Sequence, residues 1–132
     1  DFDVDELTVV WQSINVENEC HYCVPAHTGI AKVMKVSEDL SEALRNETAL
    51  PSAKLEALRT FTVQMVRERG NLSKAKMKVF FDAGYGHRAV LDVILGLAQK
   101  TMSNYINHVA KTPVDEVFQP LLWQRGDAPL KV

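Results

Sequence analysis

Apolar residues recur every three or four positions along most of this 132-residue chain, a spacing typical of helices that bury one face. The first such stretch covers residues 3–16, where Asp3 or Asp5 can cap a helix. The run from Thr8 to Trp11 also suits a strand, but the longer pattern favours the helix. Its predicted apolar face carries Leu7, Val10, Trp11 and Ile14.

Three further helices are predicted in the middle of the chain. Residues 38–46 form a short one. A longer helix covers residues 52–69 and is ended by Gly70, which can take a left-handed backbone conformation. Ser73 caps the next helix, which stops at the glycines of residues 84–86.

The longest periodic stretch runs from His87 to Lys111, and its first half is apolar nearly all round. Such a helix belongs at the centre of a bundle or in a subunit interface. Asn104, Asn107 and His108 cluster in its last turns. They either line a polar site near the cysteines or form an ordinary helix end whose histidine meets free carbonyls, and the second interpretation is favoured. The apolar positions are Leu91, Ile94, Leu95, Ala98, Met102, Tyr105, Ile106 and Val109.

A last helix is predicted over residues 112–123, with Thr112 as its cap and Pro113 at its first position. Pro120 should kink this helix. The tail, residues 124–132, is expected to be loose.

Helix follows helix without a convincing strand, so we predict an all-α fold, a compact bundle of about six helices. The chain is 46% hydrophobic and long enough for one core, which predicts a single domain over residues 1–132.

The net charge of −2 offers no basic surface for nucleic acid or for an anionic membrane. No apolar run reaches the length of a membrane span, and nothing resembles a signal peptide. We therefore expect neither nucleic acid nor a membrane among the partners. The two cysteines, three residues apart, suit a reducing compartment, so a cytoplasmic location is expected.

The candidate chemistry lies in Cys20, Cys23 and His27. On a helix these three side chains fall within an arc of about 60°. A Cys-x-x-Cys pair in an otherwise cysteine-free chain suggests a redox pair that cycles to a disulfide. Pro25 is tolerated only near a helix start, so the helix carrying His27 should begin around residues 20–22.

Two physical arguments disagree on which thiol is activated. The positive end of the helix stabilises a thiolate and favours Cys20, which stands at or just before the predicted start. The imidazole of His27 lies one turn beyond Cys23 and favours that thiol instead. The residues alone leave both open.

Two non-catalytic alternatives use the same residues. Cys20, Cys23 and His27 could bind structural zinc with His108 or His87 as the fourth ligand, but no second closely spaced ligand pair is present. The cysteines could also be inert core residues. Redox chemistry is favoured over both, so neither a metal nor a cofactor is expected.

Residues 18–28, Asn-Glu-Cys-His-Tyr-Cys-Val-Pro-Ala-His-Thr, resemble the active-site segment of the carboxymuconolactone decarboxylase and alkyl hydroperoxidase D-like superfamily, in its peroxidase-like branch. The similarity continues through residues 82–85 and 104–108, so it covers most of the chain. The resemblance implies the same all-α fold, arranged in homo-oligomers, often trimers or hexamers. Because the chain starts at Asp1 and the family has further upstream helices, we expect N-terminal helices to be missing.

The resemblance also implies an activity, that of a thiol-dependent alkyl hydroperoxidase or disulfide reductase with an antioxidant role. Cys23 would attack the hydroperoxide, Cys20 would resolve the sulfenic acid as a disulfide, and His27 would transfer the proton. An external dithiol or a protein reductant would then reduce the disulfide. A lactone or decarboxylase-type enzyme on the same scaffold is the alternative, which the retained cysteine pair disfavours.

The sequence departs from the family pattern in two places. The family has a glutamate upstream of the first cysteine, where this chain has Thr8, and a histidine before the second cysteine, where it has Tyr22. Glu17 and His21 are therefore only weak candidates for the rest of the proton relay.

Overall fold

The computed structural model describes residues 2–126 and contains, within that range, seven helices and no strand. This confirms the all-α prediction. The α-helices are α1 (Val4–Glu17), α2 (Cys23–Val33), α3 (Glu38–Arg45), α4 (Ala53–Glu68), α5 (Lys74–Asp82) and α6 (His87–Ala110), followed by a 3₁₀ helix, η1 (Glu116–Leu121).

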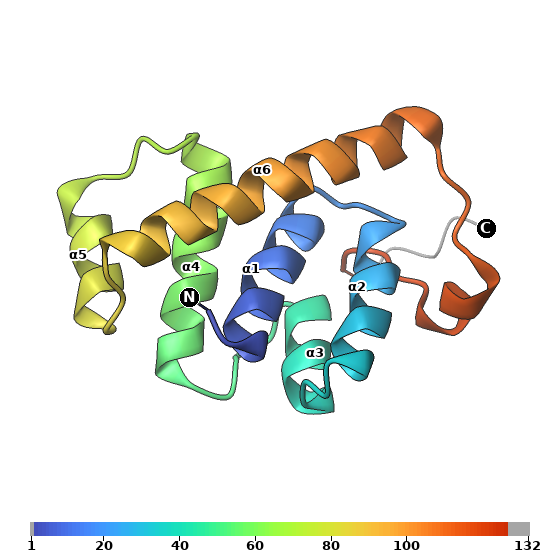
Figure 1. Ribbon diagram of the computed structural model, residues 1–132, viewed down its shortest axis with the longest axis horizontal. Coiled ribbons are helices and arrows are strands. Elements are labelled where there is room, and N and C mark those ends of the chain that lie inside the picture. The colour runs from blue at the N-terminus through green and yellow to red at the C-terminus, as the bar shows by residue number, and fades with distance from the viewer. Residues whose placement is uncertain (1, 127–132) are drawn as a thin grey trace.

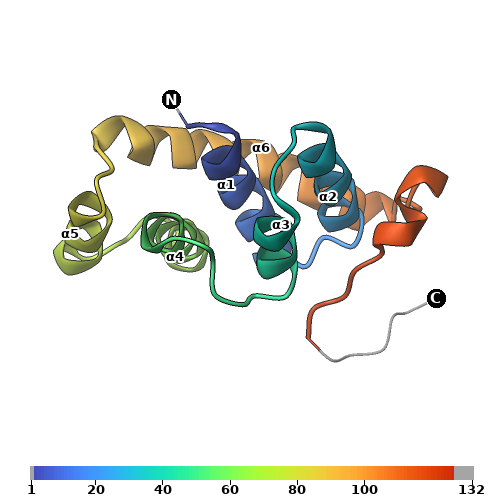
Figure 2. The ribbon, with the colours of Figure 1, turned by 90° about the horizontal axis from the view of Figure 1, so that it is seen from below.

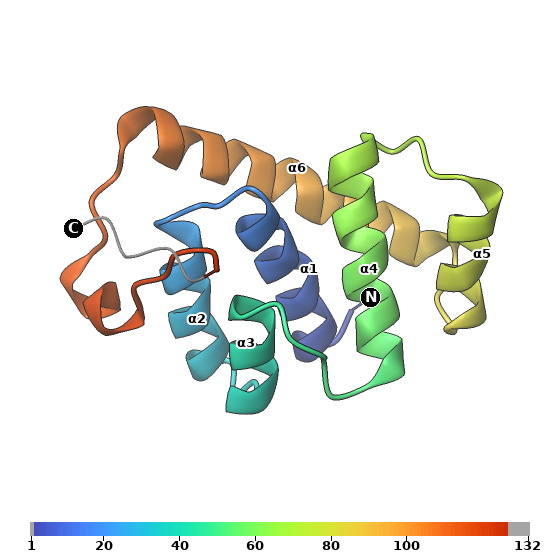
Figure 3. The same ribbon diagram turned by 180° about the vertical axis from the view of Figure 1, so that it is seen from behind.

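Helix α1 packs against four other helices, α2, α3, α4 and α6. Helix α6 runs along the long axis and crosses α4 and α1 (Figures 1 and 3). Its N-terminal end lies near α5, and its C-terminal end leads to η1, which packs on α2. Figure 2 shows α4 end-on beside α1, with α6 running behind α1 and α2.

The helix starts follow from residues that can cap them. The Asp3 carboxylate accepts the backbone N–H of Glu6 at 2.8 Å, and the Glu6 carboxylate accepts that of Asp3 at 3.1 Å, forming a capping box. Ser37, Ser52 and Ser73 cap α3, α4 and α5 through their hydroxyl groups. The predicted strand alternative for residues 8–11 is wrong, because these residues lie inside α1.

The main core forms where α1, α3 and α4 meet, and it includes an aromatic stack. The rings of Phe61 and Phe80 lie 3.8 Å apart, and the Tyr85 ring stacks on Phe80 at 4.7 Å. These aromatics join α4 to α5 and to the loop before α6. The other fully buried side chains include Val9, Val10, Ile14, Leu40, Leu58 and Val93.

Of two predicted helix boundaries, one holds to within a residue and one is wrong. Helix α2 begins at Cys23 with Tyr22 as its N-cap, so Cys20 stands just ahead of the helix, as expected. The helix predicted over residues 112–123 is only the six-residue 3₁₀ helix η1, which contains Pro120; because Pro120 has no N–H, it cannot make an α-helical bond to the carbonyl of residue 116.

The tail is described only in part. Arg125 forms ion pairs with Glu17 at 3.1 Å and with Glu47 at 2.7 Å, so this part of the predicted loose tail is held to the helices. Residues 127–132 lie outside the described residues, and their looseness stays a prediction.

Helix α6 is buried on one face only. Val93 and Gly96 pack inward, whereas the opposite face exposes large apolar side chains, so the bundle-centre prediction is wrong for this single chain. In the described part of the chain, no helix has the length and apolarity needed to cross a membrane. The exposed apolar side chains of α6 are Leu91, Ile94, Leu95, Met102, Tyr105, Ile106 and Val109, which we call the α6 stripe.

Gly96 allows α6 to approach α1 closely. A Cβ atom added at this position would stand 2.8 Å from Cγ1 of Val10, which is fully buried. Because Val10 is β-branched and held in the core, it has little freedom to move away. The crossing of α6 over α1 therefore depends on a residue without a side chain at position 96.

Gly96→Val should destabilise the fold by about 1–3 kcal/mol, because two further methyl groups must enter a filled space. Urea unfolding measures the change. Gly86→Val is the matched control: a Cβ at position 86 meets nothing within 4 Å, and we expect a loss below about 1 kcal/mol. Equal losses in the two variants would contradict the close-approach explanation.

Candidate redox site

The two cysteines form a disulfide at the start of α2, so the structure shows the oxidised state. Their Cα atoms lie 5.2 Å apart, and the side chains are 0% and 3% exposed for Cys20 and Cys23. The loop before α2 turns at Glu19, whose backbone is left-handed, and the Cys20 N–H donates to the Asn15 carbonyl at 3.0 Å. The local fold thus brings the pair together without help from distant segments.

The start of α2 at Cys23 bears on the choice between the two thiols. Cys23 is the first helical residue, at the positive end of α2, and its own backbone N–H donates to Cys20 Sγ at 3.1 Å. The first N–H of α2 therefore points at the Cys20 sulfur, so the helix-end argument still favours Cys20, whereas His27, which lines the same cavity as Cys23, favours Cys23.

A cavity of about 290 Å³ opens beside Cys23 and brings together residues from three helices. Cys23 and His27 line it, whereas Cys20 does not. The cavity walls are mostly apolar, so a small organic molecule would fit them. The other residues lining it are Tyr22, Ala26, Ile30, Lys100, Ser103, Asn107 and Phe118.

His27 is held between α1 and α6. Its Nε2 atom lies 2.7 Å from Nζ of Lys100, and its ring packs edge-on against Trp11 at 5.3 Å. Burial, and to a lesser extent the charge of Lys100, lowers the pKa of His27 to about 3. The imidazole is therefore uncharged near neutral pH. Lys100 is only 8% exposed, and burial lowers its pKa as well.

Asn107 adds a hydrogen-bond donor beside the sulfur. Its side-chain amide lies 3.4 Å from Cys23 Sγ and also donates to the Ser103 carbonyl at 2.9 Å. This distance suits a weak hydrogen bond to sulfur, and such a bond would strengthen to a thiolate. Asn107 thereby ties α6 to the reactive end of α2.

A buried amide network supports the site from behind. Asn104 donates to the Asn15 side-chain oxygen at 2.8 Å, and Asn15 donates to Gln12 at 3.0 Å. Gln12 in turn donates to the Val24 carbonyl at 3.2 Å. The favoured prediction of an ordinary helix end therefore does not describe these residues. Asn107 lines the cavity beside Cys23, as the alternative had it, and Asn104 supports the site from behind. His108 instead stacks on His21, with the ring centroids 6.3 Å apart.

The two weak relay candidates lie away from the cavity. Glu17 pairs with Arg67 at 2.6 Å and with Arg125; these cations lower its pKa although burial opposes them. The His21 ring lies 2.9 Å from the Thr112 carbonyl, so the structure does not bring either group into the cavity.

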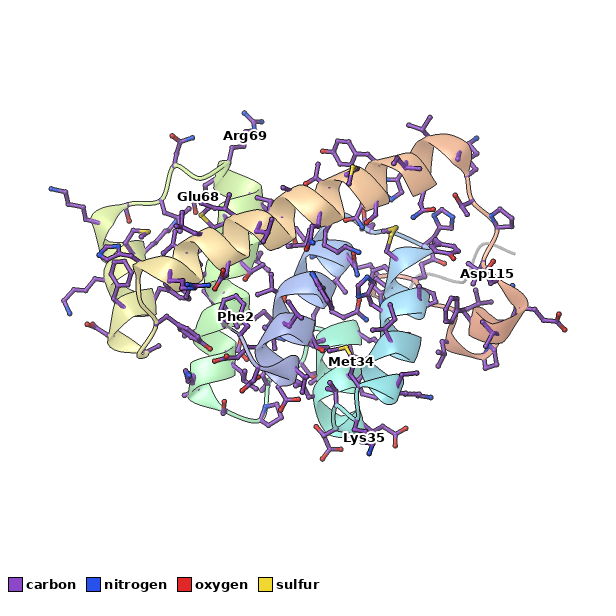
Figure 4. All side chains as sticks on the ribbon, in the orientation of Figure 1. Phe2, Met34, Lys35, Glu68, Arg69 and Asp115 are labelled. Atoms are coloured by element: carbon purple, nitrogen blue, oxygen red, sulfur yellow. A yellow bond between two sulfur atoms is a disulfide. The ribbon has the colours of Figure 1, made fainter. Side chains whose placement is uncertain are left out.

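The phenol of Tyr22 stands where the family resemblance implied a histidine. It donates to the Asp115 carboxylate at 2.6 Å, and this bond raises the phenol pKa. Figure 4 shows Asp115 beside η1, on the side of α2.

The zinc ligand set considered from the sequence is not assembled. His87 packs on Phe81 at the far end of α6 from the cysteines, at 4.9 Å between ring centroids. Among the described residues, no three histidine, cysteine or acidic side chains gather as a metal site would require.

The sequence analysis missed Lys100, Ser103 and the contact of Asn107 with sulfur. A signal for Lys100 was present, because it follows Val93 and Gly96 at helical spacing and therefore falls on the buried face of α6. A lysine at a core position is rare enough to mark a candidate site.

No family model and no curated protein matches this chain. Its fold is similar to the crystal structure of an uncharacterized peroxidase-related protein from Silicibacter sp. TM1040, with a TM-score of 0.70 and 21% sequence identity. The match covers 87% of this chain but only 60% of that protein. The likeness shows the all-helical fold and is consistent with an alkyl hydroperoxidase D-like arrangement; membership of that superfamily stays a prediction.

Acid should destabilise this site, because the folded protein holds His27 uncharged. The unfolded chain takes up a proton near the ordinary pKa of 6.5 and the folded one only near 3, so the stabilisation is complete above 6.5 and is lost as the pH falls towards 3. Urea unfolding at several pH values from about 7 down to about 4 measures the slope. His27→Gln should flatten it, whereas His21→Gln, at an exposed ring, should leave it unchanged; equal slopes in His27→Gln and the parent would contradict the burial effect.

Proposed function

We propose that this protein is a thiol-dependent peroxidase that reduces small organic hydroperoxides with the Cys20–Cys23 pair. The observation that carries the proposal is a closed cysteine pair whose second sulfur lines a cavity together with His27. The peroxidase-related structural neighbour is compatible with redox chemistry. A cavity of about 290 Å³ suits a small substrate.

The reaction begins with the reduced protein. The Cys23 thiolate attacks the outer oxygen of the hydroperoxide, the O–O bond breaks, and the sulfur becomes a sulfenic acid. The alkoxide that leaves takes a proton through His27 and departs as the alcohol. The Cys20 thiol then attacks the Cys23 sulfur; the S–S bond forms and hydroxide leaves with the thiol proton as water.

Reduction of the disulfide must occur through Cys23. Cys20 is fully buried and does not line the cavity, whereas Cys23 does. A thiolate of an external dithiol, or of a protein reductant, attacks Cys23 to form a mixed disulfide and releases Cys20. A second thiolate of the reductant then frees Cys23. Because Cys23 is only 3% exposed, a small dithiol or a narrow segment of a protein reductant would reach its sulfur more easily than a broad protein surface.

The α6 stripe bears on assembly. Over the 24 residues of α6, or about 36 Å of helix, its members fall within about 120° of the helix circumference. Exposed apolar surface of this extent is unusual on a monomer. We propose that a second copy of the chain covers it in a homo-oligomer, a trimer or a hexamer, because identical stripes can pack against each other.

The peroxidase proposal predicts one rapid change in intact mass. Fully reduced protein, treated with chelator and one equivalent of an organic hydroperoxide, should lose the mass of two hydrogens as the disulfide closes. Cys23→Ser should abolish peroxide consumption, because the attacking sulfur is gone. Cys20→Ser should consume one equivalent and retain one added oxygen, because nothing resolves the sulfenic acid. A parent protein whose mass stays constant, or a Cys23→Ser variant as fast as the parent, would overturn the proposal.

The assembly proposal predicts that light scattering with size exclusion gives a mass of three or six chains for the parent. Leu95→Lys should shift this mass towards one chain, because it places a charge within the α6 stripe. Val33→Lys, at an exposed apolar position on α2, is the matched control and should not change the mass. A monomeric parent at micromolar concentration would refute the self-association.

A further inference from the structure

Lys100 is a buried ammonium group without an anionic partner. It is 8% exposed, and among the described residues no carboxylate pairs with it or lines its cavity. A buried lone charge is costly, so lysine at a core position calls for a compensating function. Its hydrogen-bond partner is His27, an uncharged base in this structure.

The titratable groups around Lys100 come from one side of the cavity. Helix α2 supplies Cys23 and His27, and Tyr22 precedes it with a phenol already bonded to Asp115. On the other sides, Trp11 of α1 packs on His27 and Phe118 of η1 closes the cavity. In the oxidised state no negative side chain lines the cavity, because Asp115 lies behind Tyr22, but reduction of the disulfide creates an anion when Cys23 ionises. That thiolate is the counter-charge that Lys100 lacks.

The hydrogen bond between Lys100 and His27 fixes how the imidazole can move protons. A lysine ammonium only donates, so Nε2 of His27 accepts and the ring proton resides on Nδ1. Nδ1–H is then free to donate elsewhere while Nε2 receives a proton from Lys100. His27 therefore stays uncharged in the resting protein, and it can give up the proton on Nδ1 while it accepts one from Lys100 at Nε2.

We propose that Lys100 is a positioning residue that controls the protons of Cys23 by acting through His27. It stabilises the Cys23 thiolate by its charge, and it supplies the proton that His27 delivers to the departing alkoxide. The second role rests on the proposed peroxidase function, whereas the first does not. Lys100 therefore occupies the place of the acid that neither Glu17 nor His21 fills.

The proton and electron balance of the step is complete. The Cys23 thiolate gives two electrons to the peroxide, the S–O bond forms and the O–O bond breaks. The alkoxide takes the Nδ1 proton of His27, and Nε2 takes a proton from Lys100, which becomes a neutral amine. Water returns the proton to Lys100 before the next turnover. The lowered pKa of the buried lysine makes this transfer easier than it would be in water.

The test uses the Cys20→Ser protein, so that only Cys23 titrates and reacts. Lys100→Met removes both the charge and the proton, and Lys100→Arg keeps the charge but does not release a proton in the accessible pH range. Lys32→Met, at an exposed lysine of α2, is the matched control. Thiolate absorbance during a pH titration gives the Cys23 pKa, and stopped-flow mixing with hydroperoxide gives the rate of sulfenic acid formation.

Lys100→Met should raise the Cys23 pKa by about one unit or more and slow sulfenic acid formation about 10²-fold at a pH where the thiol is ionised. Lys100→Arg should keep the Cys23 pKa near that of the parent yet remain slow. The parent rate should rise with pH as Cys23 ionises and then fall as Lys100 loses its proton. The fall should be absent in both variants, a change that damage to the fold alone would not produce.

Each outcome decides a separate point. An unchanged Cys23 pKa in Lys100→Met overturns the proposal, whatever the peroxide reaction does. Fast reaction of Lys100→Arg, with the alkaline fall retained, overturns the proton-supplying role. A raised Cys23 pKa in a protein that ignores peroxide supports the control by Lys100 but overturns the peroxidase function. Should Lys100→Met fail to fold, Lys100→Gln replaces it, because glutamine keeps a donor for His27 without the charge.

Discussion

The close contact between Gly96 of α6 and Val10 of α1 sets the geometry of the redox site. Lys100 follows Gly96 by about one helical turn and Asn107 by about three, so both are carried to α2 by the same rigid helix. A side chain at position 96 would lift α6 from α1 and draw these groups away from His27 and Cys23. One close contact in the core thus controls the distances of these groups from the sulfur.

The buried amides add directional control to this packing. Gln12, Asn15 and Asn104 lie wholly inside the protein, and their side chains bond to one another and to the backbone of α2. Buried amides left without partners would be costly, so the observed arrangement of α1, α2 and α6, which satisfies them together, is favoured. The start of α2, and with it the position of Cys23, is therefore fixed by hydrogen bonds as well as by apolar contact.

Most of the fold could be predicted from local signals, because caps and apolar periodicity act over a few residues. Ser73 caps its helix as expected, and Ser37 and Ser52 cap theirs in the same way. The helix predictions failed where two local signals conflict, as at Pro120, or where packing between distant segments determines the structure. Cys20, Cys23 and His27 were recognisable because the motif is contiguous in the sequence, and the closed pair is compatible with the expected redox role. Lys100 lies 73 residues from His27, and no local pattern could reveal that the crossing of α6 over α1 brings them together.

The charge of the group beside His27 determines which role the imidazole can take. A carboxylate beside an imidazole favours the charged ring, which would then hold a thiolate by direct attraction. Here an ammonium is the neighbour, burial and that charge keep the ring neutral, and the positive charge resides on Lys100 instead. Because attraction between charges grows as solvent is excluded, a buried ammonium can stabilise a thiolate that the neutral ring cannot. In the proposed mechanism, the same charge loses its counter-charge when Cys23 is tied up in the disulfide, and this favours attack by an external thiol on the oxidised protein.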